Sequence, residues 1–144
     1  MLDRAWIADH IPHQGKMCLL DKVVDWSGAY ILCQASSHAR EDNPLRSHGR
    51  LGVCAGIEYA AQAMAVHGAL LADPQAAPRQ GYLTSVRCVN FHVARLDDLP
   101  HPLQIRAERL SGDDQLILYQ FTVHHESLCL LEGRATVVLD AQQF

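Results

Sequence analysis

The chain has 144 residues, of which 49% are hydrophobic and 19% are charged, a composition that suits one folded domain and excludes a disordered protein. Its formal net charge of −4 argues against nucleic acid as a partner, because phosphate binding needs a basic face. The cysteines are odd in number, five, with no C-x-x-C pair, which favours the reduced side chains of a cytoplasmic protein over a disulfide framework or a zinc site.

The first third of the chain predicts short elements and then a loop. The N-terminal residues contain no apolar stretch suited to a signal peptide. A short helix is expected over residues 5–10. Strands are expected over residues 19–26 and 30–36, separated by the turn pair Ser27-Gly28. Residues 37–51 are polar and contain Pro and Gly, which is typical of a loop.

Residues 52–72 form a nearly all-apolar segment that predicts a long, buried helix. It carries one acid, Glu58, and one amide, Gln62, a single turn apart and therefore on the same face. Burial favours the protonated form of a carboxyl group that has no partner, which is the form needed of a general acid. A lone buried Glu is more often a structural residue bonded to amides, but the sequence around Glu58 favours catalysis. The polar groups, with His67, make the segment a poor membrane span.

The remainder of the chain predicts four strands, over residues 82–93, 103–110, 115–124 and 128–139. Every second residue over 117–123 is a strongly apolar or aromatic one, as expected of a half-buried strand. One long helix followed by an antiparallel meander predicts a single α+β domain, residues 1–144, in which the sheet wraps around the helix.

Two segments carry recognisable motifs. Residues 11–26, IPHQGKMCLLDKVVDW, contain a Pro-His pair followed by Leu-Leu-Asp-Lys-Val at the first strand. Residues 43–62, NPLRSHGRLGVCAGIEYAAQ, place a Pro-containing turn and a His before a helix with an acid-x-x-Ala-Gln motif. This ordered set resembles the β-hydroxyacyl-ACP dehydratases of fatty acid synthesis, and most of all the dehydratase-like branch of aryl polyene and related pigment clusters. The resemblance covers most of the chain and implies a hot-dog fold.

The resemblance implies dehydration of 3-hydroxyacyl-ACP thioesters to trans-2-enoyl-ACP. In the family a His removes the proton α to the thioester carbonyl and an acid from the opposite chain of a dimer protonates the departing hydroxyl, while a backbone amide near the helix start holds the carbonyl oxygen. The matching positions are His48 and Glu58, with Gly52 and Val53 at the helix start. The interval from His48 to Glu58 is about one helical turn shorter than in the dehydratases. His48 is therefore either the base or an ordinary loop histidine.

The other histidines are weighed one by one, and most are expected to have structural roles. We expect His13 to pin the start of the first strand and His67 to be a satisfied core residue, while His38 lies near enough in sequence to substitute for His48. His124 and His125 point to opposite faces of a strand, which is wrong for a shared metal. No metal-binding or nucleotide-binding motif occurs, so we expect no metal and no cofactor.

A carrier-bound substrate predicts cations near the loop that precedes the helix. Arg46 and Arg50 are the candidates, together with Gln62, Gly52 and Val53, for contacts to the phosphopantetheine arm and the acyl carrier protein. Arg87 and Arg95 are further candidates, although each arginine alone is more often a solvated surface residue.

Two other functions remain open. The chain could be a non-catalytic hot-dog subunit that pairs with an active dehydratase, which the shortened loop favours. It could also be an acyl thioesterase that uses Glu58 to activate water or to attack the thioester. A homodimer or heterodimer is expected in each case, because a small sheet leaves an open edge that pairs readily.

Overall fold

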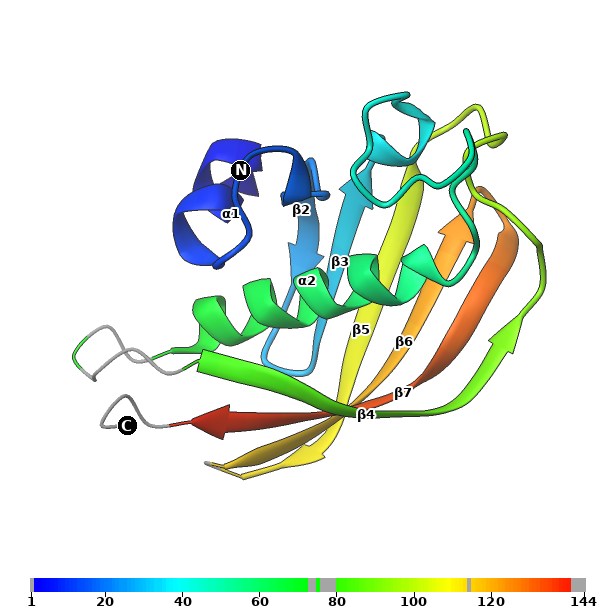
Figure 1. Cartoon of the computed structure of the whole chain (residues 1–144). Coiled ribbons are helices and arrows are strands. Elements are labelled where there is room, and N and C mark those ends of the chain that lie inside the picture. Colours follow the sequence, from blue (N-terminus) through cyan, green and yellow to red (C-terminus); the bar gives the residue numbers. More distant parts are fainter. Residues whose placement is uncertain (1, 73–74, 76–79, 114, 141–144) are drawn as a thin grey trace.

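A computed structural model describes residues 2–72, 75, 80–113 and 115–140. One seven-stranded antiparallel sheet curves around a long helix (Figure 1). The strands are β1 (Leu2–Asp3), β2 (Lys22–Trp26), β3 (Tyr30–Ala35), β4 (Gln80–Phe91), β5 (Leu103–Gly112), β6 (Leu116–His125) and β7 (Leu128–Asp140), in the order β1-β2-β3-β5-β6-β7-β4. The helices are α1 (Arg4–His10), α2 (Ala55–Leu71) and the single 3₁₀ turns η1 (Gly15–Met17) and η2 (Ser37–Ala39). The predicted α+β arrangement is confirmed.

Helix α2 occupies the concave side of the sheet because one of its faces is made of small and apolar side chains. Tyr59, Ala63 and Val66 are fully buried and belong to the same hydrophobic core as the inner side chains of β3, β5 and β6. Gly56 permits the closest approach, since a Cβ atom there would lie 2.5 Å from Cδ2 of Leu131 on β7. The helix is not buried all round as its composition predicts, because Glu58, Ala61 and Ala65 are only partly buried.

The inner face of the sheet follows the alternation expected from the sequence. Ile117, Tyr119, Phe121 and Val123 on β6 are each at most 5% exposed, whereas Gln120 between them is exposed. Period-two burial of this kind fixes which face of the strand meets the helix. It therefore sets the register of the whole meander.

The N-terminal residues form an arm, residues 2–21, that covers one end of α2 (Figure 1). Its anchors are apolar side chains that are at most 4% exposed, namely Ile7, Ile11, Leu19 and Leu20. We predicted a strand from residue 19, but β2 begins at Lys22. The reason is that side chains satisfy the backbone of Leu19. Its N–H donates to Gln62 and its carbonyl accepts from Ser37, so no strand ladder is needed there.

The loop between β3 and α2 is held by a buried polar network. The hydroxyl of Ser37 lies 2.8 Å from the hydroxyl of Tyr59, and the amide of Asn43 donates to that same Tyr59 oxygen at 3.0 Å. Asn43 also accepts from the backbone N–H of Leu45 at 2.8 Å. Burial raises the pKa of Tyr59, which keeps this hydroxyl neutral. The network fixes the position of Leu45 against the helix.

His67 is a satisfied core histidine, as predicted. It is fully buried, its Nε2 donates to the carbonyl of Ser27 at 2.8 Å and its Nδ1 accepts from the hydroxyl of Tyr119 at 2.8 Å. Desolvation lowers the pKa of this imidazole.

Over the part of the chain that the structure describes, none of the helices is both long and apolar enough to cross a membrane.

Candidate active site

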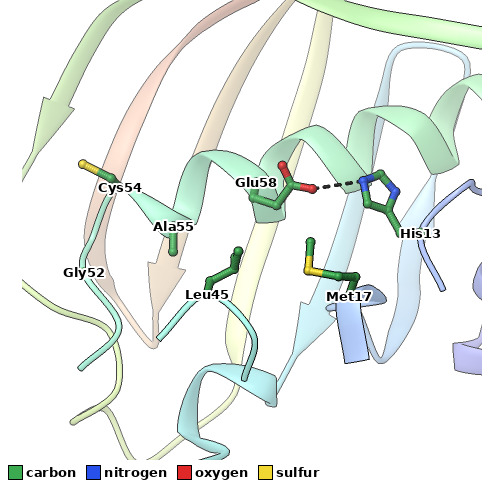
Figure 2. Close-up of a pocket in the computed structure, with 7 residues that line it drawn as sticks. All are labelled: His13, Met17, Leu45, Gly52, Cys54, Ala55 and Glu58. Carbon is green, nitrogen blue, oxygen red and sulfur yellow. Dashed lines mark ion pairs between the residues drawn. The ribbon is translucent and has the colours of Figure 1, made fainter. Parts of the chain in front are cut away.

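A pocket of about 510 Å³ opens beside the first turns of α2. Three separate parts of the chain form it: the N-terminal arm, the loop before the helix and the helix itself. The lining residues are His13, Met17, Leu45, Gly52, Cys54, Ala55 and Glu58 (Figure 2). Most of the wall is therefore apolar, and two titratable side chains face each other within it.

Those two side chains are His13, from the arm, and Glu58, from α2. Nε2 of His13 lies 3.0 Å from Oε1 of Glu58, as the dashed line in Figure 2 shows. Their side chains are 27% and 34% exposed, so both remain accessible from the pocket. We expected Glu58 to be a buried acid that acts with His48, and His13 to pin the start of the first strand. The structure instead pairs them, and the arm supplies the histidine.

Gln62 holds this pair in place, which sequence spacing predicted only in part. Its Nε2 donates to Oε1 of Glu58 at 3.3 Å, as expected for side chains one turn apart. The same amide nitrogen donates to the carbonyl of Met17 at 2.7 Å, and its oxygen accepts from the N–H of Leu19 at 2.9 Å. Gln62 is fully buried. It therefore ties the acid on the helix to the arm that carries His13.

Within the described part of the chain, the second nitrogen of His13 has no competing partner. Its Nδ1 atom is buried, and no described residue forms a hydrogen bond with it. Glu58 is thus the protein group with which this imidazole can exchange a proton. A paired acid and base at one pocket wall is an arrangement suited to general acid–base chemistry.

Residues at the start of α2, among them Gly52 and Cys54, line the same pocket. No described residue accepts a hydrogen bond from the N–H of Gly52, two residues before the N-cap, or from that of the N-cap Cys54. Val53 does not contribute its amide, because that N–H donates to the carbonyl of Ala94 at 3.1 Å. Of the two predicted positions, Gly52 lines the pocket, whereas the side chain of Val53 belongs to the core.

An ion pair fixes the residue before these amides. Asp97 accepts from the N–H of Leu51 at 2.9 Å and contacts the guanidinium of Arg95. Arg95 holds the pKa of this carboxyl well below its usual range. Arg95 is therefore engaged in supporting the helix start and is a poor candidate for binding a carrier.

His48, the predicted base, lies at the tip of a turn. Ser47 and Arg50 exchange two backbone hydrogen bonds, of 2.8 and 3.0 Å, so His48 and Gly49 are the two central residues. Both have positive φ, 54° and 75°, as a two-residue turn of this kind requires. The imidazole is exposed and contacts the hydroxyl of Ser47 at 3.0 Å. It does not line the pocket of its own chain, and its delivery to a partner chain stays a prediction.

The two arginines expected near the loop have different surroundings. Arg46 is half-buried and donates to the carbonyls of Gly49, at 3.2 Å, and His38, at 3.5 Å, so it holds the loop together. Arg50 is exposed, and no described side chain pairs with its guanidinium. Of these two arginines, Arg50 is the one whose side chain no described residue engages.

His38, the alternative histidine, does not line the pocket. It is 1% exposed, and its Nε2 donates to the carbonyl of Leu99 at 3.0 Å. Burial lowers the pKa of this group, so it stays neutral at physiological pH. The family match favoured His48, with His38 as its substitute. The histidine that contacts Glu58 within this chain belongs instead to the Pro12-His13 pair.

A sheet curved around one long helix defines the class of hot-dog proteins. This chain adds an acid–histidine pair at its pocket. Within that class the chain belongs to the ApeP-like family, since residues 5–144 match the family described as ApeP dehydratase. No curated protein matches the sequence.

Solved structures support the fold. The dehydratase heterocomplex ApeI:P from Xenorhabdus doucetiae contains a chain that is 23% identical, with a TM-score of 0.78 over 94% of this chain and 91% of that one. A thioesterase from Haemophilus influenzae is 10% identical, with a TM-score of 0.64 over 85% and 80%. A thioesterase from Staphylococcus aureus is 12% identical, with a TM-score of 0.63 over 83% and 93%. At these identities the likeness concerns the fold.

Proposed function

We propose that the chain dehydrates 3-hydroxyacyl thioesters carried on an acyl carrier protein to trans-2-enoyl thioesters, in synthesis of the aryl polyene type. Membership of the ApeP-like family supports the reaction class. The observation that carries the proposal is the His13–Glu58 contact of 3.0 Å at the wall of an otherwise apolar pocket. An apolar pocket with a few polar groups suits an acyl chain with one reacting end.

The pair can carry both proton transfers of the dehydration. Neutral His13 takes the proton from the carbon α to the thioester carbonyl, and the C–H electron pair forms the new double bond. The bond from the β carbon to its hydroxyl breaks, and protonated Glu58 supplies the proton that makes the leaving group water. His13 is then protonated and Glu58 is ionised. Return of the proton along their direct contact restores both groups without a further reactant.

The free amides of Gly52 and Cys54 are suited to the thioester oxygen. Charge develops on that oxygen as the α proton leaves, and backbone N–H groups near a helix start can stabilise it without rearranging. Gln62 serves as a positioning residue, because it contacts Glu58 and the arm but does not line the pocket.

Two partners follow from this proposal. The first is the acyl carrier protein, whose acidic surface would meet the exposed Arg50. The second is another hot-dog subunit, because the ApeI:P complex is a dehydratase heterocomplex of similar fold. The outer edge of β4 is unpaired among the described strands, and an exposed edge is a ready site for strand pairing.

The experiment compares wild type with Glu58→Gln and His13→Gln on a 3-hydroxyacyl-carrier thioester. Enoyl product from wild type should fall by a factor of at least about 100 in each variant, the usual contribution of a positioned acid or base. His48→Ala is the matched control, and it keeps wild-type turnover if its imidazole is not the base. Folding of each variant is checked by thermal unfolding.

Other outcomes point to other functions. A large loss in His48→Ala with little change in His13→Gln would transfer the base to the loop histidine of a partner chain. Release of free acid would indicate the thioesterase, which the structural neighbours of similar fold also represent. No turnover by folded wild type, with activity restored by a second hot-dog subunit even for Glu58→Gln, would indicate the non-catalytic subunit.

A further inference from the structure

A second cluster of chemically active side chains lies on the outer face of the sheet, away from the pocket. It consists of His92, just after β4, with Cys129 and Glu132 on β7. The ligand atoms of the three all lie within 4.8 Å of one another. Nε2 of His92 is 2.8 Å from Oε2 of Glu132, and Sγ of Cys129 is 3.9 Å from that same oxygen. None of the three lines the candidate active site.

A β-bulge in β7 brings these residues to one face. Val123 of β6 pairs with Leu131, whereas the next residue, His124, pairs with Cys129, so Leu130 is the extra residue. Leu130 and Leu131 are both fully buried, although adjacent residues of a regular strand point to opposite faces. The bulge therefore turns Cys129 to the outer face.

The bulge also positions His92, the third residue of the cluster, through a backbone hydrogen bond. The carbonyl of the extra residue, Leu130, accepts from the N–H of His92 at 2.9 Å. The pairing of β4 with β7 places Asn90 opposite Glu132, two residues before His92. Both backbone contacts keep the imidazole of His92 beside Cys129 and Glu132. The backbone pairing of β4 with β7 therefore brings the three side chains together.

We propose that His92, Cys129 and Glu132 bind one zinc-like divalent cation. A thiolate, an imidazole nitrogen and a carboxylate are the ligand types that Zn²⁺ accepts, and three protein ligands leave one position of a tetrahedral site open. Ligand atoms bound at about 2.0–2.3 Å from a common ion lie roughly 3.3–3.8 Å apart, so a small rotation of each side chain closes the site. His124, which is the cross-strand partner of Cys129, is a candidate for the fourth position.

The sequence predicted no metal because these residues do not form a motif. His92 is 40 residues from Glu132, and Cys129 stands alone among widely spaced cysteines. A fixed spacing such as C-x-x-C would have been visible, but the convergence depends on strand pairing and on the bulge.

The test is titration of the metal-free, reduced full chain with Co²⁺ and then with Zn²⁺. One equivalent of Co²⁺ should give the near-ultraviolet absorption of a cobalt–thiolate bond, and Zn²⁺ should displace it. At a hundredfold excess over its dissociation constant, Zn²⁺ should raise the unfolding midpoint by about 5 °C or more. Absence of the cobalt–thiolate absorption in folded wild type would overturn the proposal.

Variants separate this site from incidental binding. Cys129→Ser and His92→Gln should each weaken Zn²⁺ binding at least tenfold. Cys88→Ser, at an exposed cysteine elsewhere on β4, and His101→Gln, in the exposed His101–Glu126 pair of 3.1 Å, are the matched controls and should bind as wild type does. Binding that survives Cys129→Ser but is lost in Cys88→Ser would also refute the assignment.

Discussion

Replacement of Gln62 by methionine should lower the free energy of unfolding by about 2–6 kcal/mol. Methionine is close to glutamine in volume, so the main change is the loss of polar contacts. The N–H of Leu19 and the carbonyl of Met17 would both lose the partner that satisfies them now. A buried backbone group left without a partner costs about 1–3 kcal/mol, and two such groups give the stated range.

The measurement is equilibrium unfolding in urea, followed by far-ultraviolet circular dichroism, for wild type and Gln62→Met. Met64→Leu is the matched control, because Met64 lies on the same helix and is 4% exposed. A volume-conserving change at an apolar site should cost less than about 1.5 kcal/mol. If the two variants lose equal stability, the amide of Gln62 does not hold the arm to the helix, and the argument for it as a positioning residue fails.

Two further predictions concern the core. Burial lowers the pKa of both His38 and His67 from the ordinary value of 6.5, so the unfolded chain binds protons more readily. The stabilisation is complete above that value, and the free energy of unfolding should fall by at most about 1 kcal/mol per histidine between pH 6.5 and 5.5, with a shallower fall in His67→Gln; an equal slope in both proteins would contradict the assignment. Gly56→Ala should cost about 1–3 kcal/mol because its Cβ meets Leu131, whereas Gly68→Ala on the same helix has open space and should gain about 0.5–1 kcal/mol. Thermal unfolding measures both, and a stabilised Gly56→Ala would show that the helix can move away from the sheet.

Much of the fold could be predicted because it depends on local patterns. The alternation over 117–123 identifies the inner face of β6, and the apolar run of residues 52–72 identifies α2. Strand β1, which has two residues and pairs with Val23 and Lys22, has no local signal. The early start predicted for β2 was wrong because Leu19 and Leu20 are apolar without belonging to a strand. Their burial reflects contacts with α2 and its surroundings, which no local window contains.

The candidate site could be predicted only where its residues share an element. Glu58 and Gln62 are one turn apart, so their contact follows from helix geometry. His13 reaches Glu58 across 45 positions, and that contact depends on how the arm folds back over α2. The match to the family's histidine favoured His48, which lies at the exposed tip of a two-residue turn in its own chain. The family resemblance located the long helix and placed Glu58 on it, whereas the catalytic roles of Glu58 and His48 stay predictions.

The arm that covers α2 also carries half of the proposed catalytic pair. The folding of the arm and the proposed catalysis therefore depend on the same segment. Residues 2–21 contribute only the two-residue strand β1 to the sheet. Their detachment would therefore leave the other six strands paired as before and the central helix in place. The same event would remove His13 and release the two backbone groups that Gln62 binds. If His13 is the base, as proposed, a molecule whose arm has detached should lose its activity toward the substrate and should not merely become less selective. Proteolytic susceptibility of the arm and turnover should therefore vary together across any series of variants.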